Sequence, residues 1–135
     1  MFKLIKIAEG GACTPEIMSM PVYNNITYKI GTVAFFESGR LTYTRSNNNS
    51  PIFYILENVT EGSGKEYIKV YPITPNMIFE ADAIQEREED LIPSHGLCYM
   101  VKTGSYVTYE LGDEFICMDN REAANRGKIV GRFKV

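Results

Sequence analysis

Hydrophobic and polar residues alternate along much of this 135-residue chain, and one pattern is written twice. Residues 28–44 and residues 96–109 each hold an apolar run between two glycines, followed by an alternating segment. Gly31 and Gly39 of the first stretch recur 65 residues later (96 − 31 and 104 − 39). Two such runs joined by a short turn that contains glycine are typical of a β-hairpin. The pattern therefore predicts two related β units, each with a hairpin.

Further short strands are predicted outside the two hairpins. They cover residues 2–7, 52–56, 67–73, 114–118 and 128–135. In the third of these, Ile68, Val70 and Pro72 should share one face, because side chains in a strand alternate. The lysines within residues 2–7 suit an edge strand. Closely spaced strands with turn signals between them are typical of a small barrel or sandwich.

Two segments favour a short helix. Asp119 and Glu122 form a possible capping box, and Gly127 suits a helix C-terminus, so a helix is expected from about residue 120 to residue 126. Asp82 begins an acidic segment that Pro93 would end, and this segment fits a short helix or a solvated loop equally well. The expected fold class is mainly β, with at most one or two short helices.

The length of the chain fits one domain. We expect an N-terminal arm or edge strand over residues 1–25 and a single β domain over residues 26–135. The β domain would contain sub-units at about 26–80 and 94–135, joined by an acidic linker at 81–93.

The apolar segment 16–23 is interrupted by Pro21, which disfavours both a helix and a central strand. An extended arm is expected instead, which either packs on its own barrel or reaches a neighbouring chain. The candidate partner-binding residues of this arm are Ile17, Met18, Met20 and Val22.

Charge and hydropathy narrow the possible partners. The formal net charge of −3 includes no concentrated basic face, so nucleic-acid binding is not expected. Neither a secretory signal nor an apolar span of 18 residues is present, so we expect a soluble protein made in a cytoplasm and no membrane partner.

No catalytic constellation can be assembled from the sequence. Cys13, Cys98 and Cys117 include no close pair, and the single histidine, His95, aligns with the apolar Ile30 of the first repeat. We therefore expect free cysteines, a half-buried structural histidine and no enzyme activity. A run of acids suggests a wet surface rather than a metal site; its members are Glu86, Glu88, Glu89 and Asp90. No cofactor is expected.

The order of these features resembles the small β-rich head decoration (cement) proteins of tailed bacteriophages. The resemblance is carried by short segments at residues 29–34, 39–41, 52–58 and 127–133. It implies a non-enzymatic virion protein that binds the major capsid protein on the outside of the capsid, often as a trimer. Residues 1–22 would then be poorly ordered before docking and would become ordered on the shell.

Two other classes of function stay open at this point. One is a different phage or prophage structural part, such as a head-fibre base or a tail component. The other is a cytoplasmic β module that binds a carbohydrate or peptide, or a small enzyme.

Overall fold

The computed structural model describes residues 1–8 and 15–135, and nearly all of its regular secondary structure is β. The described chain forms two compact units. Unit 1 contains residues 1–8 and 74–135, and unit 2 contains residues 15–73. The predicted fold class, a small β-barrel protein with two related β units, is confirmed.

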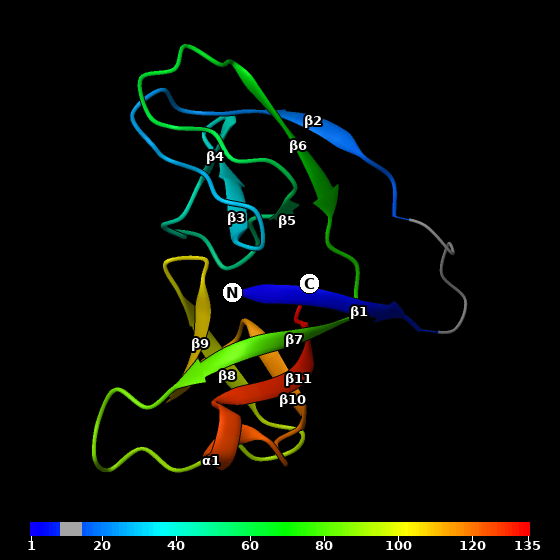
Figure 1. The fold of residues 1–135 in the computed structure, drawn as a ribbon, viewed down its shortest axis with the longest axis vertical. Coiled ribbons are helices and arrows are strands. Elements are labelled where there is room, and N and C mark those ends of the chain that lie inside the picture. Colours follow the sequence, from blue (N-terminus) through cyan, green and yellow to red (C-terminus); the bar gives the residue numbers. More distant parts are fainter. Residues whose placement is uncertain (9–14) are drawn as a thin grey trace. The chain divides into compact units, whose positions relative to one another are not determined.

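Unit 1 is a closed five-stranded barrel with one additional strand. Its elements are β1 (Phe2–Ile7), β7 (Met77–Ile84), β8 (Cys98–Lys102), β9 (Tyr106–Leu111), β10 (Phe115–Asp119), α1 (Ala123–Arg126) and β11 (Lys128–Phe133). The strand order is β7-β11-β10-β8-β9, and a parallel pairing of β7 with β9 closes the barrel. β1 pairs antiparallel with the first part of β7 (Figure 1), which confirms the edge strand predicted at residues 2–7.

Four phenylalanines fill the interior of unit 1. Phe2 of β1 lies with its ring centroid 5.8 Å from that of Phe115 and 5.0 Å from that of Phe133. Phe79 of β7 meets Phe133 edge-on, at 5.2 Å. All four side chains are buried. β1 is therefore part of the core of this barrel, because burial of a phenyl ring is a large stabilising term.

Unit 2 is a smaller sheet built on the same plan. Its strands are β2 (Met18–Pro21), β3 (Val33–Glu37), β4 (Arg40–Thr42), β5 (Ile52–Ile55) and β6 (Tyr67–Pro72). Their order is β2-β6-β5-β3-β4, and a parallel bridge between Val22 and Leu41 joins the two ends. Tyr28 is fully buried in the core of this unit, where its hydroxyl donates to the carbonyl oxygen of Leu41 at 2.6 Å.

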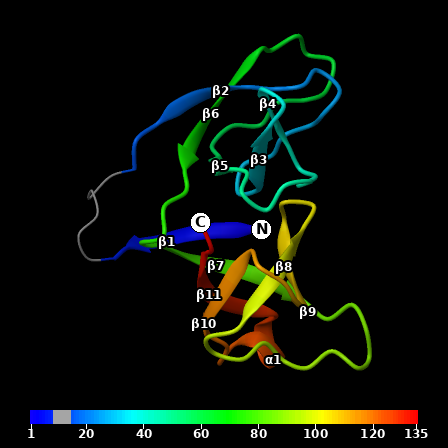
Figure 2. The same cartoon turned by 180° about the vertical axis from the view of Figure 1, so that it is seen from behind.

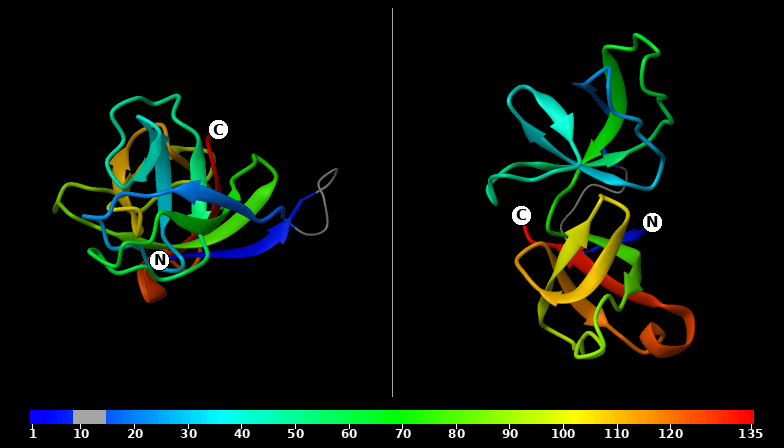
Figure 3. Two further views of the ribbon diagram at one scale, coloured as in Figure 1. Left: turned by 90° about the horizontal axis from the view of Figure 1, so that it is seen from above. Right: turned by 90° about the vertical axis from the view of Figure 1, so that its left-hand side faces the viewer.

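Both predicted hairpins are present, with glycine in each turn. In the β3–β4 turn, Ser38 and Gly39 have φ angles of 52° and 81°, and in the β8–β9 turn Thr103 and Gly104 have 53° and 67°. Consecutive positive φ angles give a turn whose twist matches that of the flanking strands. The β8–β9 hairpin is the yellow one in Figure 2, and the β3–β4 hairpin is the cyan one in Figure 3.

The two units repeat strand by strand. The order β2-β6-β5-β3-β4 becomes β7-β11-β10-β8-β9 when each strand is replaced by its counterpart. The register of the strand pairs agrees as well. Ala34 of β3 pairs with Phe53 of β5, and at the corresponding positions Tyr99 of β8 pairs with Phe115 of β10. In the next pair of strands, Ile55 pairs with Val70 as Cys117 pairs with Gly131.

The closures of the two units also correspond. The Val22–Leu41 bridge of unit 2 is parallel, as is the Ala83–Val107 pair of unit 1. On this basis β2 is the counterpart of β7, with Met18, Met20 and Val22 in the places of Phe79, Ala81 and Ala83. β1, in contrast, has no counterpart among the described residues of unit 2.

The expected boundaries of the two units were wrong. The division falls between Ile73 and Thr74, and the supposed linker at 81–93 begins inside β7. Glu80 and Asp82 alternate along this strand with the buried Phe79, Ala81 and Ala83. Because alanine is only weakly hydrophobic, the alternation of apolar and polar residues is weak here, and the acidic residues made the segment look like a solvated linker. Residues 85–92 form a loop, so of the two alternatives left open for this segment the structure shows the loop and not the helix.

The helix predicted at 120–126 is confirmed as α1, and Gly127 ends it with a φ of 62°. The capping box is wrong, because the helix is capped at Glu122 without a side-chain hydrogen bond. Asp119 instead accepts hydrogen bonds from the side chain and backbone of Arg121, which lower the pKa of its carboxyl to about 2. None of the described helices is long or apolar enough to cross a membrane.

Candidate partner-binding edge

β2 is paired along only one of its two edges in the part of the chain that the structure describes. It runs antiparallel to β6, and the N–H of Val22 donates to the carbonyl oxygen of Glu66 at 3.1 Å. Backbone groups in an antiparallel strand alternate in direction, so those of Met20 also face β6. The N–H and C=O groups of Ile17 and Ser19 then point away from β6, and no described strand pairs with them. We call this the β2 open edge.

The four candidate residues from the sequence do not share one environment. Ile17 and Met18 are exposed, at 59% and 38%, whereas Met20 is half-buried against the core of unit 2. Val22 is 5% exposed and belongs to that core. The expectation that Val22 is available to a partner is therefore wrong, because this side chain lies inward beside the bridge that closes the unit.

The arm was expected either to pack on its own barrel or to reach a neighbouring chain, and its two described strands pack within the chain. β2 packs on its own unit through the antiparallel ladder with β6, and β1 pairs with β7. Residues 9–14, the rest of the segment that was expected to order on docking, lie outside the described residues. Pro21 lies at a position whose N–H would face the open edge, so the pyrrolidine ring removes no hydrogen bond to β6.

A pocket that no local sequence pattern predicted lies beside the C-terminal end of β2. This pocket has a volume of about 610 Å³, and Tyr23, Arg40 and Lys65 are among its lining residues. The Arg40 guanidinium lies over the Tyr23 ring at 5.4 Å from its centroid, and Lys65 pairs with Glu57 at 2.9 Å. The lining thus combines Arg40, the ion-paired Lys65 and the acidic Glu66 with an aromatic face.

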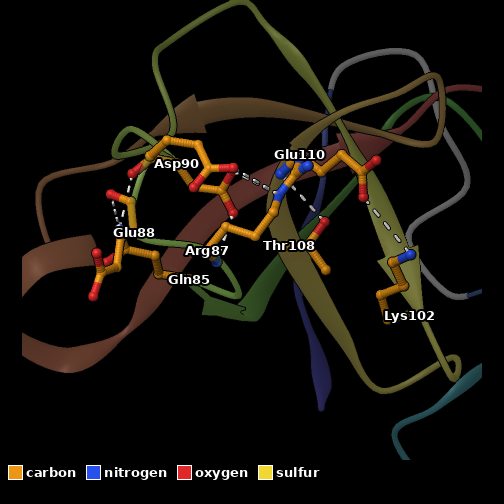
Figure 4. A network of polar contacts seen from close by, with 8 residues as sticks. Gln85, Arg87, Glu88, Asp90, Lys102, Thr108 and Glu110 are labelled. Atoms are coloured by element: carbon orange, nitrogen blue, oxygen red, sulfur yellow. Dashed lines mark hydrogen bonds and ion pairs between the residues drawn. The ribbon is translucent and has the colours of Figure 1, made fainter.

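The acidic residues of the 85–92 loop hold the loop together. The Arg87 guanidinium lies 3.4 Å from a carboxylate oxygen of Asp90, and the side-chain amide of Gln85 donates to the Asp90 carbonyl at 2.9 Å (Figure 4). Tyr106 of β9 donates to the Glu86 carboxylate at 2.9 Å. Within the described residues, no cluster of three potential ligands could hold a metal ion.

The cysteines lie on neighbouring strands of unit 1. Cys98 pairs in register with Ile116, so Cys98 and Cys117 lie on opposite faces of the sheet and both are free thiols. Burial raises the pKa of both thiols, which keeps them protonated at neutral pH. Cys13 lies outside the described residues.

The expectation of a half-buried histidine is wrong. His95 is exposed in the turn before Gly96, and its counterpart Ile30 is likewise exposed before Gly31. Both glycines have strongly positive φ angles, 87° at Gly31 and 85° at Gly96. The residue before the glycine, Ile30 in one unit and His95 in the other, therefore lies on a tight surface turn and is exposed whether it is apolar or polar.

Comparison of the chain with protein-family models, with curated proteins and with solved structures gave no match. Function is therefore inferred from the geometry of the β2 open edge and from the pattern of the sequence.

Proposed function

We propose that this protein is a non-enzymatic structural component of a tailed-phage particle that decorates the capsid by binding the major capsid protein. The observation that carries the proposal is the β2 open edge, where backbone groups that pair with no described strand lie beside the exposed apolar side chains of Ile17 and Met18. An exposed edge with apolar flanks is a template for pairing with another chain.

The physics of a shell favours such a contact. Main-chain hydrogen bonds to an open edge depend little on the sequence of the partner, and apolar pockets beside the edge add specificity. Each contact can be modest in free energy, because a homo-oligomer such as a trimer binds through several copies at once. The protein would be made in the host cytoplasm and retained on the capsid surface.

The test is sedimentation of a native lysate through a gradient, followed by detection of the chain. We expect it to migrate with capsid-sized particles at a copy number near that of the major shell protein. The variant Ile17→Asp/Met18→Asp should reduce the particle-bound fraction at least tenfold, because it places two charges beside the edge. Ile30→Asp is the matched control, since Ile30 is also an exposed apolar residue of unit 2. Wild-type protein that stays at the top of the gradient while particles sediment would refute the proposal.

The same gradient addresses another role in the particle. A few copies per particle, rather than hundreds, would indicate a tail component or a head-fibre base.

The pocket lined by Tyr23, Arg40 and Lys65 favours a second candidate, a module that binds a small anionic or aromatic ligand. A ligand that binds only the folded state raises the melting temperature. A ligand-dependent rise that Arg40→Ala abolishes would support this candidate.

A further inference from the structure

We propose that the β2 open edge is an acceptor slot, which an extended segment of the partner protein fills and so completes unit 2 as β1 completes unit 1. The identity of that partner rests on the proposed function, but the slot itself follows from comparison of the two units.

The first observation is the position of β1 relative to β7. β1 lies along the edge of β7 that faces away from β11, with Lys3 opposite Glu80 and Phe2 opposite Ala81. At the ends of this ladder, the Asp82 N–H donates to the Met1 carbonyl at 3.3 Å and the Ala8 N–H donates to the Asn76 carbonyl at 2.7 Å. In unit 2 the corresponding edge is the β2 open edge.

The backbone of β2 presents the same groups. Ser19 takes the place of Glu80, and Ile17 takes the place of Ile78, so their N–H and C=O groups occupy the positions that pair with β1 in unit 1. Pro21 takes the place of Asp82 and lacks the N–H that Asp82 donates. An added strand can therefore form ladder hydrogen bonds with Ile17 and Ser19, but it receives no hydrogen bond from Pro21.

The side chains of β2 are consistent with a missing neighbour. Met18 and Phe79 occupy corresponding positions on the inward faces of their strands. Phe79 is completely buried, whereas Met18 is 38% exposed. Likewise Met20 is only half-buried, whereas its counterpart Ala81 is fully buried. The exposure lies at the end of β2 where a strand equivalent to β1 would pack.

Unit 1 also indicates the chemistry of the occupant. Phe2 enters the barrel between Phe115 and Phe133, whose counterparts in unit 2 are Phe53 and Pro72. The occupant is thus an extended, antiparallel segment with an aromatic side chain opposite Met20. β1 of a second copy is not that segment, because Phe2 is buried in its own barrel and its removal would open that barrel.

Amide hydrogen exchange of the full chain, read by NMR, tests the slot directly. In the free protein, the amides of Ile17 and Ser19 should exchange fast and those of Ile78 and Glu80 slowly, since among the described strands only the latter two amides have a partner strand, β1. The probe is a synthetic peptide with the sequence of residues 2–7, acetylated and amidated. At saturation it should slow exchange at Ile17 and Ser19 at least tenfold, and a peptide carrying Phe2→Ala should not.

Two variants separate the backbone contact from the side chain. Ser19→Pro removes an N–H of the open edge that makes no bond to β6, so the melting temperature should change little while peptide protection is lost. Ser19→Ala keeps that N–H and should behave as wild type. Slow exchange of the Ile17 and Ser19 amides in the free protein would overturn the proposal. If the exchange is slow at every protein concentration, another segment of the same chain covers the edge. If it is slow only at high concentration, two copies of the chain pair through this edge. Failure of the peptide to protect these amides would also overturn the proposal.

Gradient sedimentation of the Ser19→Pro variant with particles distinguishes failure of the acceptor slot from failure of the virion role. If wild type sediments with particles and Ser19→Pro does so equally, the virion role stands and the acceptor slot is wrong. If wild type does not sediment with particles, the virion role is lost, and the exchange experiment still decides the slot.

Discussion

Met18 and Phe79 lie at corresponding positions in two barrels of the same strand order, yet one is exposed and the other is completely buried. Phe79 meets Phe133 edge-on beneath the strand that carries Phe2. Met18 has no such strand beside it among the described residues. The repeated fold thus has this position filled in unit 1 and open in unit 2, among the described residues.

Phe2→Ala should reduce the free energy of unfolding by about 3–5 kcal/mol, the usual cost of removing a buried phenyl ring. The physical cause is the loss of packing against Phe115 and Phe133. Denaturant unfolding measures the change. Ile5→Ala on the same strand is the control, since Ile5 is exposed and should cost well under 1 kcal/mol. Equal effects of the two variants would show that β1 is not part of the core.

Tyr28→Phe should destabilise the protein by about 1–3 kcal/mol, because it leaves buried polar groups without a partner. The Tyr28 hydroxyl donates to the Leu41 carbonyl and accepts from the Tyr23 N–H at 3.1 Å. Tyr67→Phe on exposed β6 surface is the matched control and should be nearly neutral. Thermal unfolding of both variants gives the comparison, and a neutral Tyr28→Phe would contradict the hydrogen bonds.

Gly131→Ala should destabilise unit 1 by about 3 kcal/mol or more, as overpacking at a rigid site does. A methyl group at this position would overlap the Ile116 carbonyl oxygen and the Phe115 ring. Gly112→Ala is the control, because its methyl group would meet mainly the flexible side chain of Met100. A larger shift of the melting temperature for Gly112→Ala than for Gly131→Ala would contradict the close approach of β10 and β11.

Stability should depend on pH through Asp82. Burial alone would raise the pKa of its carboxyl, but hydrogen bonds from Lys128 and from the Met1 amino group outweigh burial and lower it. A carboxyl whose pKa is lower in the folded state stabilises the fold above its unfolded pKa of about 3.9, and the gain is lost as the pH falls through the folded pKa.

Asp82→Asn should therefore lower the melting temperature more at pH 7 than at pH 2. The cost at pH 7 should not exceed about 1 kcal/mol, since solvent screens a partly exposed pair. Glu61→Gln in the exposed loop of unit 2 is the control and should show no such difference. An equal effect of Asp82→Asn at both pH values would contradict the linkage.

Much of the β structure was predictable because it is encoded locally. The hairpin turns contain Gly39 and Gly104, which adopt the positive φ angles that the turns need. The alternation of Ile68, Val70 and Pro72 places the first two in the core and the third half-buried on the same face. Gly127 ends α1 as its conformational freedom predicts. Each of these features depends only on residues close together in the chain.

The candidate site was predicted only in part. Ile17 and Met18 are exposed as a binding segment requires, but Val22 is buried. The difference lies in strand pairing: Val22 is bridged to Leu41, which is far away in the sequence. The pocket beside Arg40 likewise combines residues from three separate segments, so no local pattern could reveal it.

The sequence alone determined most of the strands, the hairpin turns and the existence of two related units, since these follow from periodicity 2 and from the backbone freedom of glycine. The tertiary structure decided where the units divide. In β7 the buried face includes the small residues Ala81 and Ala83, which alternate with acidic residues, so the sequence pattern there does not indicate a strand. The tertiary structure also decided that β1 completes one barrel while the β2 edge stays open among the described residues. Pairing between distant strands depends on which apolar surfaces find each other in three dimensions, and a linear pattern does not contain that information.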